Sequence, residues 1–139
     1  MKSRKYLTHS EEETIALGRQ LARDISGVTL LIGNLGAGKT TFAKGIVEGR
    51  GAARAEDVSS PTFTLIHQYA PDIYHVDLYR LDDEREVENI GLRDLFSGPT
   101  LVLLEWAERF PALMPRERFE IRLAALGDQT REITISRLS

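Results

Sequence analysis

The stretch Gly33-Asn34-Leu35-Gly36-Ala37-Gly38-Lys39-Thr40 follows the pattern G-x-x-x-x-G-K-[ST]. Its three glycines allow the backbone to turn tightly and to direct successive N–H groups inward. In such a loop the lysine adds a mobile positive charge, and the hydroxyl after it is placed to bind Mg²⁺. The stretch therefore predicts a phosphate-binding loop.

The residues on either side of the loop favour the same interpretation. Val28-Thr29-Leu30-Leu31-Ile32 has the apolar character of a buried parallel strand. The stretch from Lys39 to Gly49 has a helical pattern, so a bound anion would lie at a helix N-terminus. The alternative is a glycine loop that only connects a strand to a helix.

Composition limits the class of protein. The 139 residues are expected to form a single domain, residues 1–139, and the absence of cysteine excludes disulfides, thiolate zinc sites and a cysteine nucleophile. No segment has the apolar length of a membrane span, and Met1 to Lys5 lacks the apolar core of a signal peptide, so a cytoplasmic location is expected. The net charge of -3 argues against a wide basic surface, so any role with nucleic acid is expected to be indirect.

The rest of the chain alternates between helical and strand patterns, which predicts an α/β fold with a central, mostly parallel sheet, antiparallel hairpins and flanking helices. Ser10 and Glu13 form a capping box that starts a helix running to about Ser26. The further predicted elements are strands over 63–69, 73–79 and 100–104, short helices from Asp83 and over 92–96, and a closing hairpin over 118–126 and 131–138.

Glu105 is the candidate Mg²⁺ carboxylate. It follows an apolar strand, and ligands of open α/β sheets bind at the carboxyl ends of the strands. An exposed strand-end glutamate in a surface ion pair is the alternative interpretation. Trp106, the next residue and the only tryptophan, is expected in the core beside Glu105. A platform on which a base stacks is the alternative for Trp106.

Asp77 is the second carboxylate of interest. It could orient or deprotonate an attacking water, or hold a water that is bound to the metal. It could instead pair with Arg80 or accept a hydrogen bond inside the hairpin. His75 and Tyr79 share its strand face, because strand side chains repeat every two residues, and His75 is interpreted as a structural histidine. Thr62 could reach the γ-phosphate or Mg²⁺ as a switch residue, or it could be part of a turn.

Phosphoryl transfer requires little more than correctly placed charges. Backbone amides and Lys39 would contact the phosphates, a metal ion would lie between the phosphate oxygens, and a carboxylate would lie near the attacking water. No arginine can be assigned as the residue that stabilises transition-state charge. The protein is therefore expected to turn over slowly alone or to be activated by a partner. Because a GTPase-type Asn-Lys-x-Asp is absent, adenine is favoured over guanine.

Four motifs in this order resemble the TsaE (YjeE) family of P-loop ATPases over nearly the whole chain. They are Gly33 to Thr41, Ser60-Pro61-Thr62-Phe63-Thr64, His75-Val76-Asp77-Leu78-Tyr79-Arg80 and Leu104-Glu105-Trp106. The resemblance implies ATP and Mg²⁺ as cofactors, slow hydrolysis, and action with the TsaD-TsaB pair that attaches threonylcarbamoyl to tRNA adenosine beside the anticodon. The chain itself would not perform the acyl transfer.

The resemblance also implies roles for individual residues. Gly36 to Thr41 would hold the phosphates, Thr40 and Glu105 would bind the metal, Thr62 would belong to a switch, and Asp77 would be catalytic with Lys39 and Glu105. Adenine would lie near Ser10 and Glu11, with help from Arg131 in the C-terminal hairpin.

Two other functions share the phosphate loop. A small-molecule kinase would need an acceptor pocket and usually an arginine-bearing lid, and no lid insertion is evident. A nucleotide-sensing adaptor would use ATP only to order the segment around Thr62. The adaptor would tolerate loss of Asp77 but would fail without Lys39.

Overall fold

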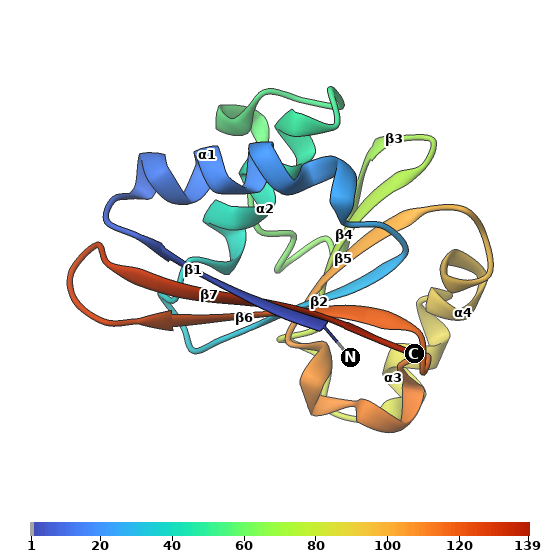
Figure 1. The fold of residues 1–139 in the computed structure, drawn as a ribbon. Helices are drawn as coiled ribbons and strands as arrows, with labels where there is room; N and C mark the ends of the chain where they lie inside the picture. The colour runs from blue at the N-terminus through green and yellow to red at the C-terminus, as the bar shows by residue number, and fades with distance from the viewer. Residues whose placement is uncertain (1) are drawn as a thin grey trace.

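The computed structural model describes residues 2–139, and Met1, the first residue of the stretch considered for a signal peptide, lies outside it. The described residues contain one seven-stranded sheet in the order β1-β7-β6-β2-β5-β4-β3. The strands are β1 (Lys2–Thr8), β2 (Val28–Ile32), β3 (Ile66–Ala70), β4 (Ile73–Asp77), β5 (Leu101–Glu105), β6 (Arg118–Ala125) and β7 (Arg131–Leu138). The α-helices are α1 (Glu11–Leu21), α2 (Lys39–Gly49), α3 (Glu84–Asn89) and α4 (Leu92–Phe96) (Figure 1).

The centre of the sheet is parallel and both of its sides are antiparallel. Strand β2 lies between β5 and β6 and runs parallel to both, and β4 runs parallel to β5. Strands β3, β7 and β1 complete the sheet through antiparallel pairs. The predicted class, a mostly parallel sheet with antiparallel hairpins, is confirmed.

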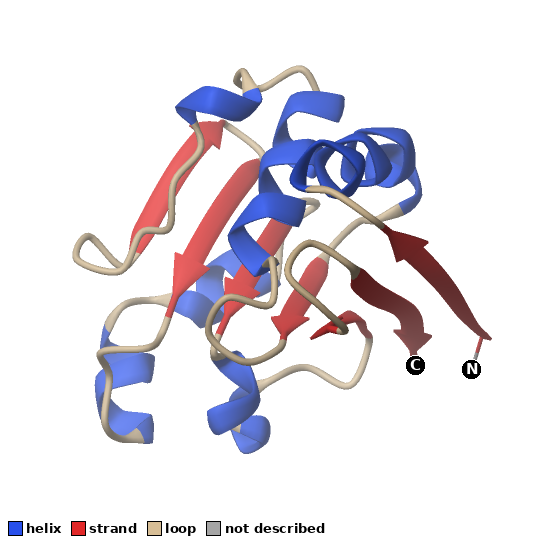
Figure 2. Cartoon of the chain, turned by 90° about the vertical axis from the view of Figure 1, so that its left-hand side faces the viewer, coloured by secondary structure: helices blue, strands red, loops and turns tan. Residues whose placement is uncertain are grey.

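Each face of the central strands has its own apolar core. On one face, side chains of β2 such as Leu31 pack with α2 through Phe42 and Ile46, and these three are fully buried. On the other face, Leu104 and Val76 pack with α3, α4 and the turns after β5. Figure 2 shows helices on both sides of the strands. The alternation of side chains along β4 and β5 therefore decides which residues face α2.

Helices α1 and α2 are in backbone contact. A Cβ atom on Gly45 would lie 2.1 Å from the carbonyl oxygen of Ile15 and 3.0 Å from the Cα of Gly18, closer than side chains can approach. Glycine is therefore required where the helices cross. The contact fixes α1, and with it Ser10 at the start of α1, relative to the helix that follows the phosphate loop.

The observed elements agree closely with the predicted ones, with four differences. The strand predicted over 73–79 ends at Asp77, and Tyr79 lies in the turn that follows it. The first helix ends at Leu21 and continues as a 3-10 turn, Ala22–Asp24, that stops short of Ser26. The prediction of strand from Phe63 is wrong, because Phe63 to Leu65 form turns in which Leu65 has φ 70°. Strand β1 was not predicted. In the described part of the chain no helix is long and apolar enough to cross a membrane.

Candidate nucleotide site

The phosphate loop connects β2 to α2, and two of its glycines have positive φ, Gly36 at 80° and Gly38 at 102°. Gly33 serves a different purpose, since a Cβ there would lie 2.6 Å from the carbonyl oxygen of Leu123. Helix α2 begins at Lys39 with no side-chain cap. Its first-turn amides have no intrahelical acceptors, so they are available to an anion.

Lys39 is buried beside the loop. Its ammonium group donates to the carbonyl oxygen of Gly33 at 2.7 Å and lies 3.3 Å from the ring centroid of Trp106. Burial lowers the pKa of Lys39, and the negative charges of Glu105, Glu108 and Asp77 oppose that change. Lys39 thus lies near two buried carboxylates, those of Glu105 and Asp77.

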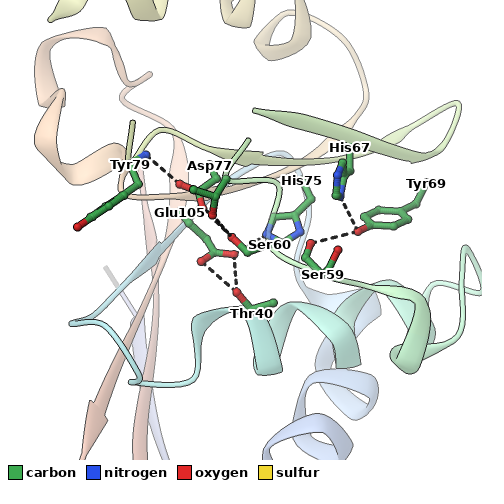
Figure 3. Close-up of polar contacts among 10 residues, drawn as sticks. Thr40, Ser59, Ser60, His67, Tyr69, His75, Asp77, Tyr79 and Glu105 are labelled. Carbon is green, nitrogen blue, oxygen red and sulfur yellow. Dashed lines mark hydrogen bonds and ion pairs between the residues drawn. The ribbon is translucent and has the colours of Figure 1, made fainter. Parts of the chain in front are cut away.

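Glu105 ends β5 on the face covered by α2 and is only 3% exposed. Both of its carboxylate oxygens accept from the Thr40 hydroxyl, at 3.2 and 3.0 Å, and Oε2 also lies 2.6 Å from Nε2 of His75 (Figure 3). The alternative of an exposed glutamate in a surface ion pair is therefore wrong. The structure brings Thr40 and Glu105, the two predicted metal ligands, into direct contact.

Asp77 ends the neighbouring strand β4 directly opposite Glu105. Its Oδ2 accepts from the hydroxyls of Ser60 at 2.6 Å and Thr62 at 3.0 Å, and its Oδ1 accepts from the backbone amide of Tyr79 at 2.8 Å. We call these four groups the Asp77 cluster. The alternative pairing of Asp77 with Arg80 is not observed; the Arg80 guanidinium lies over the Phe63 ring, 5.1 Å from its centroid.

A cavity of about 1060 Å³ joins these residues. Of the predicted site residues, it is lined by Ser10, Glu11, Leu35, Gly36, Gly38, Lys39, Thr40, Thr41, Thr62, Asp77, Glu105 and Arg131. Gly33, Asn34 and Ala37 do not line it. Gly33 lies against the backbone of β6 at Leu123, and Ala37 is buried in the core.

Arg131 connects the β6–β7 turn to the phosphate loop. Its Nη2 donates to the carbonyl oxygen of Gly36 at 3.1 Å, and its Nη1 donates to the carbonyl oxygens of Gly127, Asp128 and Thr130. The side chain lines the cavity, but most of its donors are already used. Its observed contacts connect the β6–β7 turn to the phosphate loop at Gly36.

The oxygen atoms at the site fit Mg²⁺. No group of three or more His, Asp or Glu side chains in residues 2–139 has the arrangement of a metal site. Mg²⁺ with a nucleotide usually needs only one or two protein oxygens besides phosphates and waters. The hydroxyl of Thr40 and the carboxylate of Glu105 are such a pair, beside an uncapped helix N-terminus that suits phosphate.

Comparison with known proteins decides the family. The family model described as "Threonylcarbamoyl adenosine biosynthesis protein TsaE" matches residues 8–133. The chain belongs to the TsaE family. The family resemblance seen in the four sequence motifs is confirmed, and the family's part in tRNA threonylcarbamoyladenosine biosynthesis applies to this chain.

TsaE relatives cover nearly all of the chain. The "tRNA threonylcarbamoyladenosine biosynthesis protein TsaE" of Bacillus subtilis is 43% identical over 98% of this chain and 87% of its own length. The protein of the same name in Treponema pallidum is 35% identical over 94% of this chain and 98% of its own. A crystal structure of Bacillus subtilis YdiB superposes with a TM-score of 0.79 at 36% identity, covering 99% of this chain and 87% of that one.

Two contacts of this TsaE site were not expected from the sequence: Ser60 donates to Asp77, and His75 contacts the candidate metal carboxylate. The bond from the Tyr79 amide to Asp77 is the hydrogen bond inside the predicted hairpin that was one of the alternatives for Asp77. The alternation that puts His75 on the same strand face as Asp77 was the one sequence signal that could have predicted the position of His75 near the site. Trp106 differs from expectation as well: it is only partly buried, packs against Tyr79 with ring centroids 5.1 Å apart, and lines the cavity.

Proposed function

We propose that this TsaE protein is an Mg²⁺-dependent ATPase that supports threonylcarbamoyl modification of tRNA adenosine beside the anticodon. It acts on a TsaD-TsaB type partner complex by binding ATP and hydrolysing it slowly. The observation that carries the proposal is the convergence of the phosphate loop, the Thr40–Glu105 pair and Asp77 on one cavity.

The loop and Lys39 supply the phosphate-binding part of this function. Uncapped amides at the start of α2 favour an anion, and Lys39 needs only to leave the carbonyl oxygen of Gly33 to reach one. Bound Mg²⁺ would neutralise charge on the β- and γ-phosphates. Thr40 and Glu105 would hold it, and Ser10 and Glu11 line the part of the cavity proposed for adenine.

Asp77 is proposed to orient the attacking water or accept its proton. Its Oδ2 accepts from the hydroxyls of Ser60 and Thr62, so a water could take the place of either hydroxyl if the connection before β3 moved. No arginine is assigned to the transition state; the Nη1 and Nη2 groups of Arg131, the arginine that lines the cavity, donate to backbone carbonyls. Slow turnover without partners is expected.

Phosphate release from ATP tests the proposal. The protein is assayed alone and with the TsaD-TsaB pair, using Lys39→Ala as the blank. Weak, Lys39-dependent release that increases with the partners is expected. Release equal to the blank in both conditions, despite ATP binding, would contradict hydrolysis, and phosphate appearing on an added nucleoside or metabolite would indicate a kinase.

A nucleotide-sensing adaptor is the second candidate, and the Asp77 cluster favours it. Two of the three hydrogen bonds of the Asp77 carboxylate, those from Ser60 and Thr62, hold the connection before β3, so ATP could act by rearranging this segment for a partner. The adaptor predicts that Asp77→Asn keeps tRNA modification whereas Lys39→Ala abolishes it. Equal loss in both variants would contradict it.

A further inference from the structure

We propose that His75 is a positioning residue for the cation site: it fixes the orientation of the Glu105 carboxylate and thereby increases the affinity for Mg²⁺-bound nucleotide. This inference rests on the proposed function, because it concerns the same site. The observation behind it is a fully buried histidine whose only polar contact within residues 2–139 is Glu105.

The strand register accounts for the contact. His75 lies two residues before Asp77 on β4, and Asp77 is opposite Glu105 on β5, so both side chains of β4 are on the face of Glu105. Nε2 of His75 lies 2.6 Å from Oε2 of Glu105. The contact fits a hydrogen bond in which Nε2–H of His75 is the donor and the carboxylate oxygen is the acceptor.

The other contact of Glu105 cannot fix the carboxylate alone. The Thr40 hydroxyl lies almost equally far from the two oxygens, at 3.2 and 3.0 Å, and the terminal torsion of a glutamate has a broad energy minimum. His75 contacts Oε2 of Glu105 and not Oε1. In the described chain the only protein contact of Oε1 is the Thr40 hydroxyl. Oε1 is therefore the oxygen that remains for a cation.

The environment of His75 suits this task. The ring is 0% exposed, and its Nδ1 has no hydrogen-bond partner in the described chain. An apolar side chain of similar size would fill this part of the core without leaving a buried polar atom unpaired, so filling the core does not account for the histidine. Hydrogen-bond partners of metal-binding carboxylates typically change metal affinity 10- to 100-fold when removed.

The test compares two substitutions at His75. His75→Gln keeps an N–H donor on a side chain long enough to reach Glu105, whereas His75→Leu has a similar volume and no donor. The dissociation constant of ATP is measured by titration calorimetry in Mg²⁺ and in EDTA. The ratio of the two constants gives the Mg²⁺-dependent gain in affinity, and thermal unfolding verifies that each variant is folded.

We expect His75→Leu to reduce the Mg²⁺-dependent gain about tenfold or more while the affinity in EDTA changes less than about twofold. His75→Gln is expected to restore most of the gain. A gain equal to that of the wild type in His75→Leu, an equal loss in both variants, or an equal loss in Mg²⁺ and in EDTA would overturn the inference. If His75→Leu does not fold, His75→Asn, which is polar but too short to reach Glu105, takes its place in the comparison.

The same titrations separate this inference from the proposed function. A wild-type protein that does not bind ATP in Mg²⁺ would contradict the proposed function itself. If Mg²⁺ increases the ATP affinity of the wild type and of His75→Leu by the same factor, only the role of His75 is overturned.

Discussion

The cavity has two walls, and different interactions hold them in place. One wall is the phosphate loop with α2, fixed by backbone contact between α1 and α2 and by the hydrogen bond from Arg131 to Gly36. The other is the connecting segment, residues 58–65, held to β4 through the Asp77 cluster. Packing between backbones permits little movement, whereas hydrogen bonds between side chains can be exchanged for bonds to a ligand.

This difference assigns separate tasks to the two walls. The wall formed by the phosphate loop and α2, which we call the packed wall, presents backbone amides, Lys39 and Thr40 in one fixed arrangement. A phosphate site requires such an arrangement. The connecting segment carries Thr62 and the largely exposed Phe63, and Leu65 in it has an unusual positive φ of 70°. A segment of this kind can change conformation when a nucleotide or a partner binds.

The largest effect is expected at the crossing of α1 and α2. Gly45→Ala would place a methyl group 2.1 Å from the carbonyl oxygen of Ile15, so the helices must separate. We expect the free energy of unfolding to fall by about 3 kcal/mol, measured by urea denaturation. Gly98→Ala, where the nearest neighbour of the new methyl is Thr100 Cγ2 at 3.9 Å, is the control. Equal stability of the two variants would contradict close packing of this wall.

The second effect concerns the connecting segment. Asp77→Ala removes the carboxylate that accepts three hydrogen bonds. The hydroxyls of Ser60 and Thr62 and the amide of Tyr79 then lose this acceptor. We expect a loss of about 2 kcal/mol in the free energy of unfolding and faster chymotrypsin cleavage after Phe63, which is 82% exposed. Unchanged cleavage relative to Asp72→Ala, a substitution in the exposed β3–β4 turn, would show that Asp77 does not hold the segment.

Sequence and structure agree best where the signal is local. The boundaries of α2 and β2 follow from apolar periodicity and the glycine loop, and Glu105 follows from its place at a strand end. Strand β1 lacked such a signal, because Lys2–Thr8 is an edge strand rich in charged residues and depends on pairing with β7, more than 120 residues away in sequence. The contact of His75 with Glu105 likewise depends on the register of β4 against β5.

A smaller effect is expected for one member of the Asp77 cluster. Ser60→Ala removes the 2.6 Å hydrogen bond and should lower the free energy of unfolding by about 1 kcal/mol. Because Ser60 acts through Asp77, the Asp77→Ala/Ser60→Ala double variant should lose less than the sum of the single losses. Additive losses in urea denaturation would mean that the serine stabilises the protein independently of Asp77.

The smallest effect is a pH dependence on the packed wall. Burial lowers the pKa of Lys39 below its usual 10.5, so folding disfavours its charged form. Below the lowered pKa the lysine is charged in both the folded and unfolded states, and its burial cost is fully present. As pH increases from the lowered pKa towards 10.5, the folded state loses its proton first and this cost decreases.

We therefore expect the stability of the wild type relative to Lys39→Met to increase with pH in that interval and to be constant below it. Urea denaturation of both proteins at several alkaline pH values measures the difference. A difference that decreases as pH increases would mean that the nearby carboxylates outweigh burial in setting the pKa of Lys39.

The central claim has two parts. The packed wall binds ATP, and Asp77, which holds the connecting segment, is needed for hydrolysis of the bound ATP. The most direct test is titration of ATP with Mg²⁺ into the wild type, Lys39→Ala and Asp77→Asn, with phosphate release recorded on the same samples in the presence of TsaD-TsaB. The account predicts that Lys39→Ala loses ATP binding, whereas Asp77→Asn binds ATP within a few-fold of the wild type and releases little phosphate. Binding retained by Lys39→Ala, or lost equally in both variants, would contradict it.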